Sequence, residues 1–437
     1  MLRKILYIFV LLFFFSCAIQ TKDDEEYPEY KSNKVWELDL SLENILDEKT
    51  QYDRYLYAVE WDKESKEGYI SKIDLYDGKR VWKSDYLFGD SFYTSVDAQL
   101  LEHEDTIYIL IDNQKESKRI LYILDDEGGI LKASVRLNET TEEYDEVRAT
   151  GVLFFYKNCF YWVRNKLCKL SLDHIDFSKD AKEEQIVKPE FLWTDERNKM
   201  YVIMFPVQHK NILYFQTYDY YGYHKQYSTR SRIIAYDLED DRELWGYNCK
   251  KLYGYGFDNM KIVGDKLYII EQGIGCFDLK TGECFHESFQ TREDLMHQDD
   301  IAGGIYSDGI AYHDGKFFYT NTTSWGSSDQ TGIPLKNLHN IICLDAKTLK
   351  MVWGVLPKGS GSQTACPTVL NGKVFVPLWL RGLCVLDEKT GKILGIDTSI
   401  IDYGGGGIGA NYNGLAMFFD YSHYEKDGLV TLMAIRP

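Results

Sequence analysis

The chain has 437 residues, of which 44% are hydrophobic and 27% are charged. These fractions are ordinary for a folded protein and exclude disorder over most of the length. The formal net charge is −18, and loss of a leader that contains Arg3 and Lys4 makes it −20 (−18 − 2). Nucleic-acid binding depends on Lys and Arg contacts to phosphate, so we expect no nucleic-acid partner. The simpler alternative is that the acidity only supports solubility.

The first 16 residues are typical of a bacterial signal peptide. Two basic residues precede the apolar run Ile5–Phe15, which is too short to span a bilayer comfortably. Cys17 follows Ser16, and a small residue before Cys resembles the lipobox of bacterial lipoproteins, although Phe14 stands where Leu is usual. This resemblance implies lipidation of Cys17, which would anchor the chain to a membrane. An ordinary signal peptide that happens to contain Cys is the alternative.

Residues 17–33 lack apolar periodicity, and we expect them to form an acidic, flexible tether. The run Gln20–Glu26 resembles the export signal of surface lipoproteins in the Bacteroidetes, and Ala18 after the Cys resembles outer-membrane sorting. These resemblances imply an outer-membrane location on the cell surface. A periplasmic location remains the alternative, as does a tether whose charge serves only solvation.

From residue 34 onward one pattern recurs: an apolar strand ends in Asp, a turn with Gly or Asp follows, and the next strand often carries Trp. The roughly 40–65-residue spacing is that of propeller blades. The Asp can accept hydrogen bonds from the turn, Gly supplies the left-handed backbone, and the Trp can pack between sheets. The blade tryptophans are Trp36, Trp82, Trp245 and Trp353. The copies are Ile73–Trp82, Leu124–Leu131, Tyr236–Trp245, Phe277–Phe285, Leu344–Trp353, Leu386–Leu394 and a weaker one at Lys169–Asp173.

A second hairpin precedes most copies, so each unit contains about four antiparallel strands. The segments Asn413–Phe419 and Leu429–Ile435 supply strands without a following Trp strand, and Lys34–Leu40 has the pattern of that missing strand. We therefore predict an all-β fold: a single β-propeller over residues 34–437, with eight blades, closed by its N- and C-terminal strands. Seven blades is the alternative, because residues 150–195 are irregular.

The pattern Asp-x-x-Thr-Gly-x-x-x-Trp resembles the tryptophan-docking repeat of propellers of the pyrroloquinoline-quinone (PQQ)-like type. The segment Cys366–Val376 resembles the Pro-x-Val-x-x-Gly-x-Val-Tyr-Val strand pair of the same propellers. The resemblance covers nearly all of residues 34–437. Dehydrogenases of this type hold their quinone with an adjacent Cys pair, a stacking Trp and acidic residues around Ca²⁺. This chain has 9 Cys and no adjacent pair. We therefore expect no cofactor and no enzymatic activity, as in the propeller lipoprotein of the outer-membrane β-barrel assembly machinery.

The eight other cysteines lie mostly in strand patterns. Cys276 and Cys284 flank one turn, and Cys159 and Cys168 flank another, so one interpretation is that each pair forms a disulfide. Burial as small hydrophobic residues is the preferred interpretation. The acidic stretch around His297 could form a metal patch with Glu293, Asp294, Asp299 and Asp300, but a solvated loop is preferred, and we expect no metal site.

Two segments are candidates for recognition. The first segment, Tyr218–Tyr227, is rich in tyrosine. The second segment, Thr322–Gly332, is a polar insertion with one Trp. The alternative for the first is a long hairpin whose tyrosines pack across the strands. We expect a monomeric, non-enzymatic scaffold that presents one face to a protein or glycan, with a divergent enzyme or a structural envelope component as alternatives. The candidate binding residues are Tyr218, Tyr220, Tyr221, Tyr223, Tyr227 and Trp325.

Overall fold

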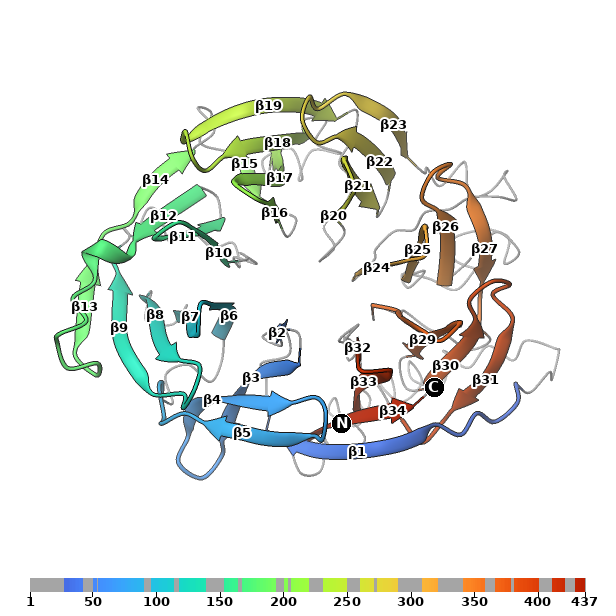
Figure 1. Cartoon of the computed structure of the whole chain (residues 1–437), viewed down its shortest axis with the longest axis horizontal. Helices are drawn as coiled ribbons and strands as arrows, with labels where there is room; N and C mark the ends of the chain where they lie inside the picture. Colours follow the sequence, from blue (N-terminus) through green and yellow to red (C-terminus); the bar gives the residue numbers. More distant parts are fainter. Residues whose placement is uncertain are drawn as a thin grey trace, which may run out of the picture.

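Eight antiparallel sheets stand around a common centre, as the computed structural model shows (Figure 1). The prediction of an all-β propeller with eight blades is confirmed. The alternative of seven blades is excluded, because the irregular region forms a complete blade of its own. The structure describes residues 27–41, 50–52, 54–89, 96–113, 118–138, 153–163, 167–193, 200–202, 206–219, 231–249, 260–270, 273–289, 309–320, 341–357, 366–378, 381–400, 411–420 and 429–436.

The first four blades follow one another along the chain. Blade 1 contains β2 (Thr50–Tyr52), β3 (Tyr55–Asp62), β4 (Glu67–Asp74) and β5 (Lys79–Lys83). Blade 2 contains β6 (Val96–His103), β7 (Thr106–Asn113), β8 (Lys118–Asp125), β9 (Leu131–Leu137) and the added β13 (Glu184–Val187). Blade 3 contains β10 (Leu153–Tyr156), β11 (Cys159–Val163), β12 (Leu167–Ser171) and β14 (Glu190–Trp193). Blade 4 contains β15 (Met200–Val202), β16 (Val207–His209), β17 (Ile212–Asp219), β18 (Ser231–Asp237) and β19 (Arg242–Cys249).

The remaining blades complete the ring. Blade 5 contains β20 (Met260–Val263), β21 (Lys266–Ile270), β22 (Gly273–Asp278) and β23 (Cys284–Phe289). Blade 6 contains β24 (Ile310–His313), β25 (Lys316–Thr320), β26 (Ile341–Asp345) and β27 (Met351–Val355). Blade 7 contains β28 (Thr368–Leu370), β29 (Lys373–Leu378), β30 (Gly382–Asp387) and β31 (Ile393–Asp397). Blade 8 contains β32 (Asn411–Tyr412), β33 (Leu415–Asp420), β34 (Val430–Arg436) and β1 (Asn33–Leu40).

Blade 8 joins the two ends of the chain. Its outer strand is β1, which runs antiparallel to β34 with Leu38 opposite Leu432 and Leu40 opposite Val430. The predicted closure by residues 34–40 is therefore confirmed. Because β1 supplies the missing outer strand, blade 8 is completed by pairing that spans almost the whole sequence, and the ring is closed without a gap.

Blades 1, 2 and 4 to 7 share one design for the turn that follows the third strand. The Asp that ends the third strand accepts hydrogen bonds from the turn; Asp345, for example, accepts them from the backbone N–H and the hydroxyl of Thr348, both at 2.7 Å. These bonds lower the pKa of Asp345, as the Thr390 bonds do for Asp387. A backbone bond also joins this turn to the turn between strands one and two in blades 1 to 7. These turns lie on one side of the ring, which we call the tight-turn face.

Four blades are attached to the next one by a tryptophan. Trp353 of blade 6 packs on Gly391 in the turn of blade 7, and its indole N–H donates to the carbonyl of Glu388 at 3.0 Å. Gly391 has a φ of +69°, and a Cβ there would lie 2.6 Å from the ring. The other pairs are Trp36 with Gly78, Trp82 with Gly129 and Trp245 with Gly282. The predicted packing of Trp between sheets is confirmed, and it explains why Gly is needed at this turn position.

The irregular region adds one strand to the neighbouring blade. Between β12 and β14 the chain leaves blade 3 and forms β13, which adds to β9 of blade 2 in parallel, with Gln185 opposite Val135. The outer strand of blade 2 has Ala133 in the place where other blades carry Trp. Ile175, from the same excursion, packs in the cluster that contains Ala133. The excursion therefore supplies an apolar side chain between blades 2 and 3, where the outer strand of blade 2 carries no Trp.

The structure differs from the expected tether at its C-terminal end. Residues 27–32, which we call the strap, lie along β31, and Tyr30 and Pro28 form backbone bonds of 3.0 and 3.1 Å with Ile396. Blade 7 has Gly395 in the place of Trp, and Tyr30 packs into the cluster between blades 7 and 8. The strap is ordered because Gly395 leaves room that an aromatic ring from another segment fills. Residues 17–26 lie outside the described part of the chain.

Candidate functional site

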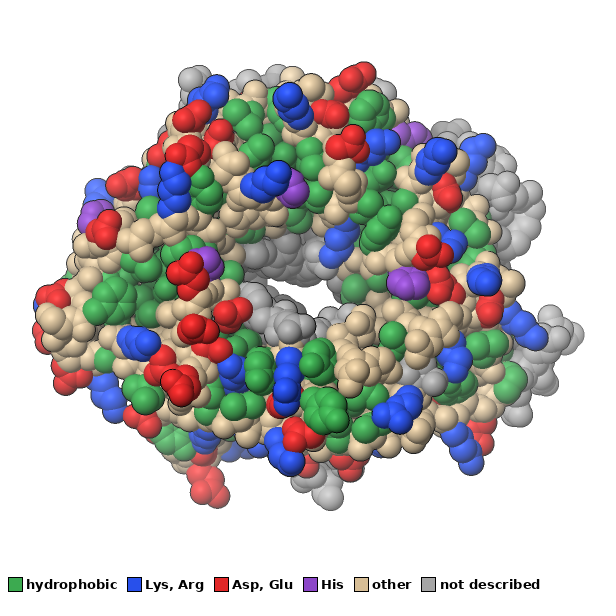
Figure 2. All heavy atoms as spheres, viewed as in Figure 1, with side chains coloured by type: hydrophobic (Ala, Val, Ile, Leu, Met, Phe, Trp, Pro, Cys, Tyr) green, Lys and Arg blue, Asp and Glu red, His purple; other side chains and the backbone are tan. Residues whose placement is uncertain are grey.

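The tight-turn face carries charges of both signs, unevenly distributed. Figure 2 looks onto this face: Asp and Glu side chains gather over blades 2 and 3 at the left, and Lys and Arg side chains are more frequent over blades 6 and 7 at the right. The opposite side of the ring bears the connections between strands two and three and between successive blades, and we call it the connection face. The two faces therefore offer different surfaces to a partner.

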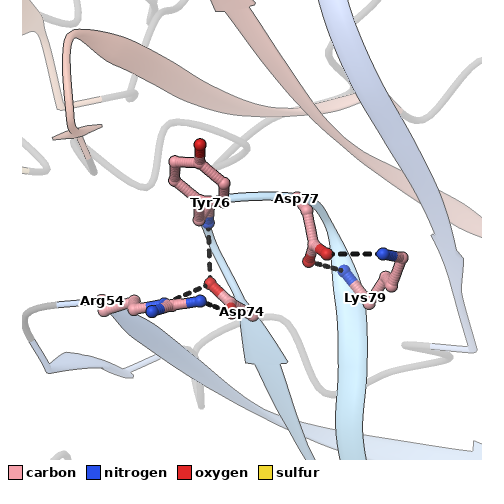
Figure 3. Close-up of polar contacts among 5 residues, drawn as sticks. All are labelled: Arg54, Asp74, Tyr76, Asp77 and Lys79. Carbon is pink, nitrogen blue, oxygen red and sulfur yellow. Dashed lines mark hydrogen bonds and ion pairs between the residues drawn. The ribbon is translucent and has the colours of Figure 1, made fainter.

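Blade 1 displays an arginine and a tyrosine at the tight-turn face. The Arg54 guanidinium donates two hydrogen bonds to the carboxylate of Asp74, one of them 2.8 Å from Nε to Oδ1, and Asp74 also accepts from the backbone N–H of Tyr76 at 2.9 Å (Figure 3). The Arg54 bonds lower the pKa of Asp74. The Tyr76 ring is 57% exposed and lies 5.6 Å from the guanidinium. A cation beside an exposed ring can bind a polar, planar group of a partner.

A buried ion pair joins blades 1 and 2. Lys72 Nζ lies 2.5 Å from Oδ2 of Asp126, and their side chains are only 7% and 17% exposed. The Tyr57 hydroxyl donates to the other oxygen of the same carboxylate. Trp82 donates its indole N–H to the Asp126 carbonyl at 2.7 Å, so this residue receives bonds from three side chains of blade 1. The seam is therefore a polar contact embedded in an apolar interface.

Glu102 lies beside this seam on the inner strand of blade 2. Its side chain is partly buried, and burial raises its pKa, with the negative charge of Asp126 as a second cause. Lys72 acts in the opposite direction but is already paired with Asp126. A carboxyl of this kind binds a proton or a cationic group more readily than an exposed one.

A second ionic seam joins blades 6 and 7. Glu388 lies 3.1 Å from Nδ1 of His313 and 3.8 Å from Nζ of Lys316, both contributed by blade 6. Glu388 follows the turn Asp of blade 7, as Asp126 does in blade 2. Both carboxylates thus bind basic residues of the preceding blade, and each offers its carbonyl to that blade's Trp. The two carboxylates are equivalent in position, whereas their basic partners lie on different strands: the third strand of blade 1, and the first and second strands of blade 6.

Sequence reasoning missed both seams, although a signal was present. Four other blades carry an apolar residue directly after the turn Asp, and blade 3 carries one after Ser171, whereas blades 2 and 7 carry a carboxylate there. Alignment of the repeats exposes this difference, but the basic partners lie about 54 and 75 positions away and become visible only in the fold. The apolar residues at the equivalent positions are Leu75, Leu172, Leu238, Leu279 and Ala346.

The predicted binding residues lie at or beyond the limit of the described chain. Tyr218 is in β17, with its backbone opposite Tyr201 and Ser231. The other residues of the predicted set, Tyr220, Tyr221, Tyr223, Tyr227 and Trp325, lie outside the described residues, as do Cys17 and the acidic stretch around His297. The flanking strands show that the two segments connect strands two and three of blades 4 and 6. Both therefore start from the connection face.

No disulfide joins the cysteines in the described part of the chain, which favours the hydrophobic interpretation. Cys276 lies opposite His286 rather than Cys284, and Cys168 lies opposite Trp162 rather than Cys159. Burial raises the pKa of Cys249, Cys343 and Cys384 to about 12. These thiols therefore stay protonated and pack as small apolar groups.

The donor groups do not match those of a quinone site. The sequence has no adjacent Cys pair, and within the described ranges no three His, Cys, Asp or Glu side chains are arranged to hold a metal ion. We derive no chemical step through a quinone. Within these described ranges, no helix is both long and apolar enough to cross a membrane.

Comparison with known proteins gives likeness of fold. No family model and no curated protein matches the chain. Among solved structures, BamB from Moraxella catarrhalis shares 11% identity at a TM-score of 0.54, over 92% of this chain and 98% of that one. A europium-containing methanol dehydrogenase shares 12% at 0.59, over 90% and 86%. A quinohemoprotein alcohol dehydrogenase from Pseudomonas putida shares 10% at 0.55, over 94% and 78%. The chain is thus similar in fold both to BamB and to dehydrogenases, and a shared fold does not by itself assign the role of either.

Proposed function

We propose that this protein is a non-enzymatic scaffold of the bacterial outer envelope, which binds a protein or glycan at the connection face of its propeller. The observation that carries the proposal is the placement of two long connections. Residues 220–230 and 321–340 join strands two and three of blades 4 and 6, where blade 5 needs only residues 271–272. Long insertions that start from one face of a rigid ring are suited to recognition.

The position of the strap supports the same proposal. The strap pairs with β31 at the outer circumference of blade 7, so the described chain begins at the side of the ring and not on either face. An anchor attached there leaves both faces accessible. The chain is similar in fold to BamB and also to a dehydrogenase. This similarity is compatible with a binding role but identifies no partner.

Replacing Tyr220, Tyr221, Tyr223 and Tyr227 by Ser is expected to abolish at least 90% of partner capture from native envelope extract. The expected loss follows from the share of binding energy that a few aromatic side chains carry in interfaces. The bait is the chain from residue 18 onward, and bound material is measured after protease or periodate treatment to separate proteins from glycans. A matched control replaces Tyr86 and Tyr312, which are exposed elsewhere. Equal capture by all three folded baits contradicts the proposal.

We further propose that Cys17 carries the lipid and that the protein faces the outside of the cell. Cys17→Ser is expected to move the protein from the membrane fraction to the soluble fraction, because two or more acyl chains are required for stable anchoring. Protease added to intact cells should degrade the native protein but spare a periplasmic marker. A Cys17→Ser protein that still sediments with membranes contradicts the anchor, and protection from protease in intact cells contradicts surface exposure.

A further inference from the structure

The strand β13 is the outermost strand of blade 2 and lies outside β9 at the circumference of the ring (Figure 1). Within the described residues it pairs only with β9, so it covers one edge and presents another. The Val187 carbonyl accepts a bond of 2.8 Å from the backbone N–H of Asn138, which extends this pairing beyond β9. Backbone groups alternate in direction along a strand, so those of Gln185 and Val187 point toward β9. Those of Glu184 and Ile186 therefore point outward, away from the ring.

The side chains of this segment alternate in exposure. Glu184, Ile186 and Lys188 are exposed, with Ile186 at 65%, whereas Gln185 is buried. The Gln185 side-chain amide donates to the carbonyl of Asp176 and accepts from its backbone N–H, both at 2.9 Å. These bonds and the pairing with β9 hold β13 in an extended conformation. The outer edge is therefore preformed, with an apolar side chain between an acidic and a basic one.

The exposed residues of this segment are complementary to a second copy of themselves. When two such strands pair antiparallel about Ile186, the two isoleucines stand opposite each other, and Glu184 of each copy stands opposite Lys188 of the other. The alternation directs the backbone N–H and C=O groups of all three residues outward, as pairing in this register requires. Pro189 has no N–H, but the same alternation places it on the side of β9. The outer strand of blade 1, β5, also has an exposed apolar centre, but a lysine at each end of it would repel its copy.

We propose that β13 binds β13 of a second copy of this chain, which joins blade 2 of both copies into one continuous sheet. The contact is isologous, with its twofold axis at Ile186, so it closes as a dimer and leaves neither β13 with a free edge. Arg136 lies 3.8 Å from Glu184 and orients its carboxylate at this edge. The proposal replaces the expectation of a monomer. It goes beyond the proposed function, because this surface lies on the circumference and not at the connection face.

Ile186→Cys tests the register directly, in the chain from residue 18 onward. Opposite residues of a hydrogen-bonded antiparallel pair have Cα atoms about 5.5 Å apart, a separation that a disulfide spans. Oxidised glutathione is expected to convert this variant to a covalent dimer about fivefold faster than Ile130→Cys, because pairing holds the two thiols together. Non-reducing gels measure the rate. The control is matched, since Ile130 belongs to the same blade and is 68% exposed. The chain without an added Cys gives the background from its own thiols.

Exchange of the flanking charges tests the pairing of Glu184 with Lys188. In the Ile186→Cys background, Glu184→Lys gives two basic flanks and Lys188→Glu gives two acidic flanks, so each variant alone is expected to cross-link about fivefold more slowly. A mixture of the two should form the mixed dimer at the rate of the parent, as should the variant that carries both exchanges. A tag on one variant resolves the mixed dimer by mass. Thermal unfolding of each variant confirms that the propeller is intact.

Equal cross-linking of Ile186→Cys and Ile130→Cys would overturn the proposal. So would a mixture of the two charge variants that forms no more mixed dimer than either variant forms of its own dimer. The tyrosine-to-serine variant described above should cross-link normally through Ile186→Cys, because it alters only the connection of blade 4. Loss of cross-linking in that variant would place the contact at the connection face and also overturn the proposal. Failure of partner capture leaves the cross-linking result unchanged, so the two proposals are tested separately.

Discussion

Replacing Trp353 by Ala is expected to lower the free energy of unfolding by about 3–5 kcal/mol, the range for removal of a large buried aromatic side chain. The ring is 8% exposed, packs against Phe318, and rests on Gly391 of the next blade. The substitution also removes the indole donor that the Glu388 carbonyl accepts. The loss falls on the contact between blades 6 and 7, because the ring lies between them.

Urea unfolding followed by tryptophan fluorescence and far-UV circular dichroism measures this change. Val352→Ala is the control, because the adjacent side chain is half exposed and its loss should change stability by less than about 0.5 kcal/mol. A reciprocal variant, Gly391→Ala, should also destabilise, since its Cβ would meet the Trp353 ring and its backbone has a positive φ. A loss below about 1 kcal/mol for Trp353→Ala would contradict the structural role given to this ring.

Breaking the pair between Lys72 and Asp126 is expected to have the second large effect. Asp126→Leu alone should lower the free energy of unfolding by about 3 kcal/mol, because it leaves a buried ammonium without its carboxylate. The double variant Asp126→Leu with Lys72→Val should recover most of this loss. Another pair of blades already has this apolar arrangement, with Ala235 of blade 4 and Leu279 of blade 5 in the equivalent places.

A double-mutant cycle in urea measures the coupling between the two residues. Lys72→Val alone should also destabilise, since among the described residues it leaves the Asp126 carboxylate with the Tyr57 hydroxyl as its remaining side-chain donor. The control is the exposed pair of Lys182 and Asp85, whose disruption should change stability by less than about 1 kcal/mol. Additive effects of the two buried substitutions would show that the ion pair does not hold the seam.

The ring and its closure were predictable because they rest on repeated local patterns. The Asp, the turn Gly and the Trp recur with the spacing of one blade, and each is required by a contact within two adjacent blades. Once the copies are aligned, Lys34–Leu40 stands out as an outer strand without its blade, and the C-terminal strands stand out as a blade without its outer strand. Local rules thus determine the architecture even where the paired residues are distant in sequence.

The strap and β13 were not predictable in the same way. Both are single extended segments without a repeat, and each covers a blade whose outer strand lacks Trp, at Gly395 and at Ala133. The absence of Trp was visible in the sequence, but the segment that fills the place was not. Its identity depends on the path of the chain across a ring, which no local pattern encodes.

The polar seams show a different limit of prediction from the sequence. A carboxylate after the turn Asp can face solvent or a neighbour, and only the register of two blades decides between these outcomes. Asp126 and Glu388 face the preceding blade because the tryptophans hold their backbone carbonyls at that seam. The candidate binding residues were a weaker case, because aromatic composition indicates recognition without specifying a partner.

The closure of blade 8 has a consequence for how the chain folds. Because β1 is synthesised first and β34 last, β1 has no partner until the final strands are made, and joining ends some 400 residues apart carries an entropic cost of about 5 kcal/mol. During this interval β1 is a solitary strand able to pair with other chains. Lys34, Glu37 and Asp39 alternate along it with apolar residues, and charges of this kind discourage aggregation. The same charges that border the finished ring thus protect the incomplete chain while the ring remains open.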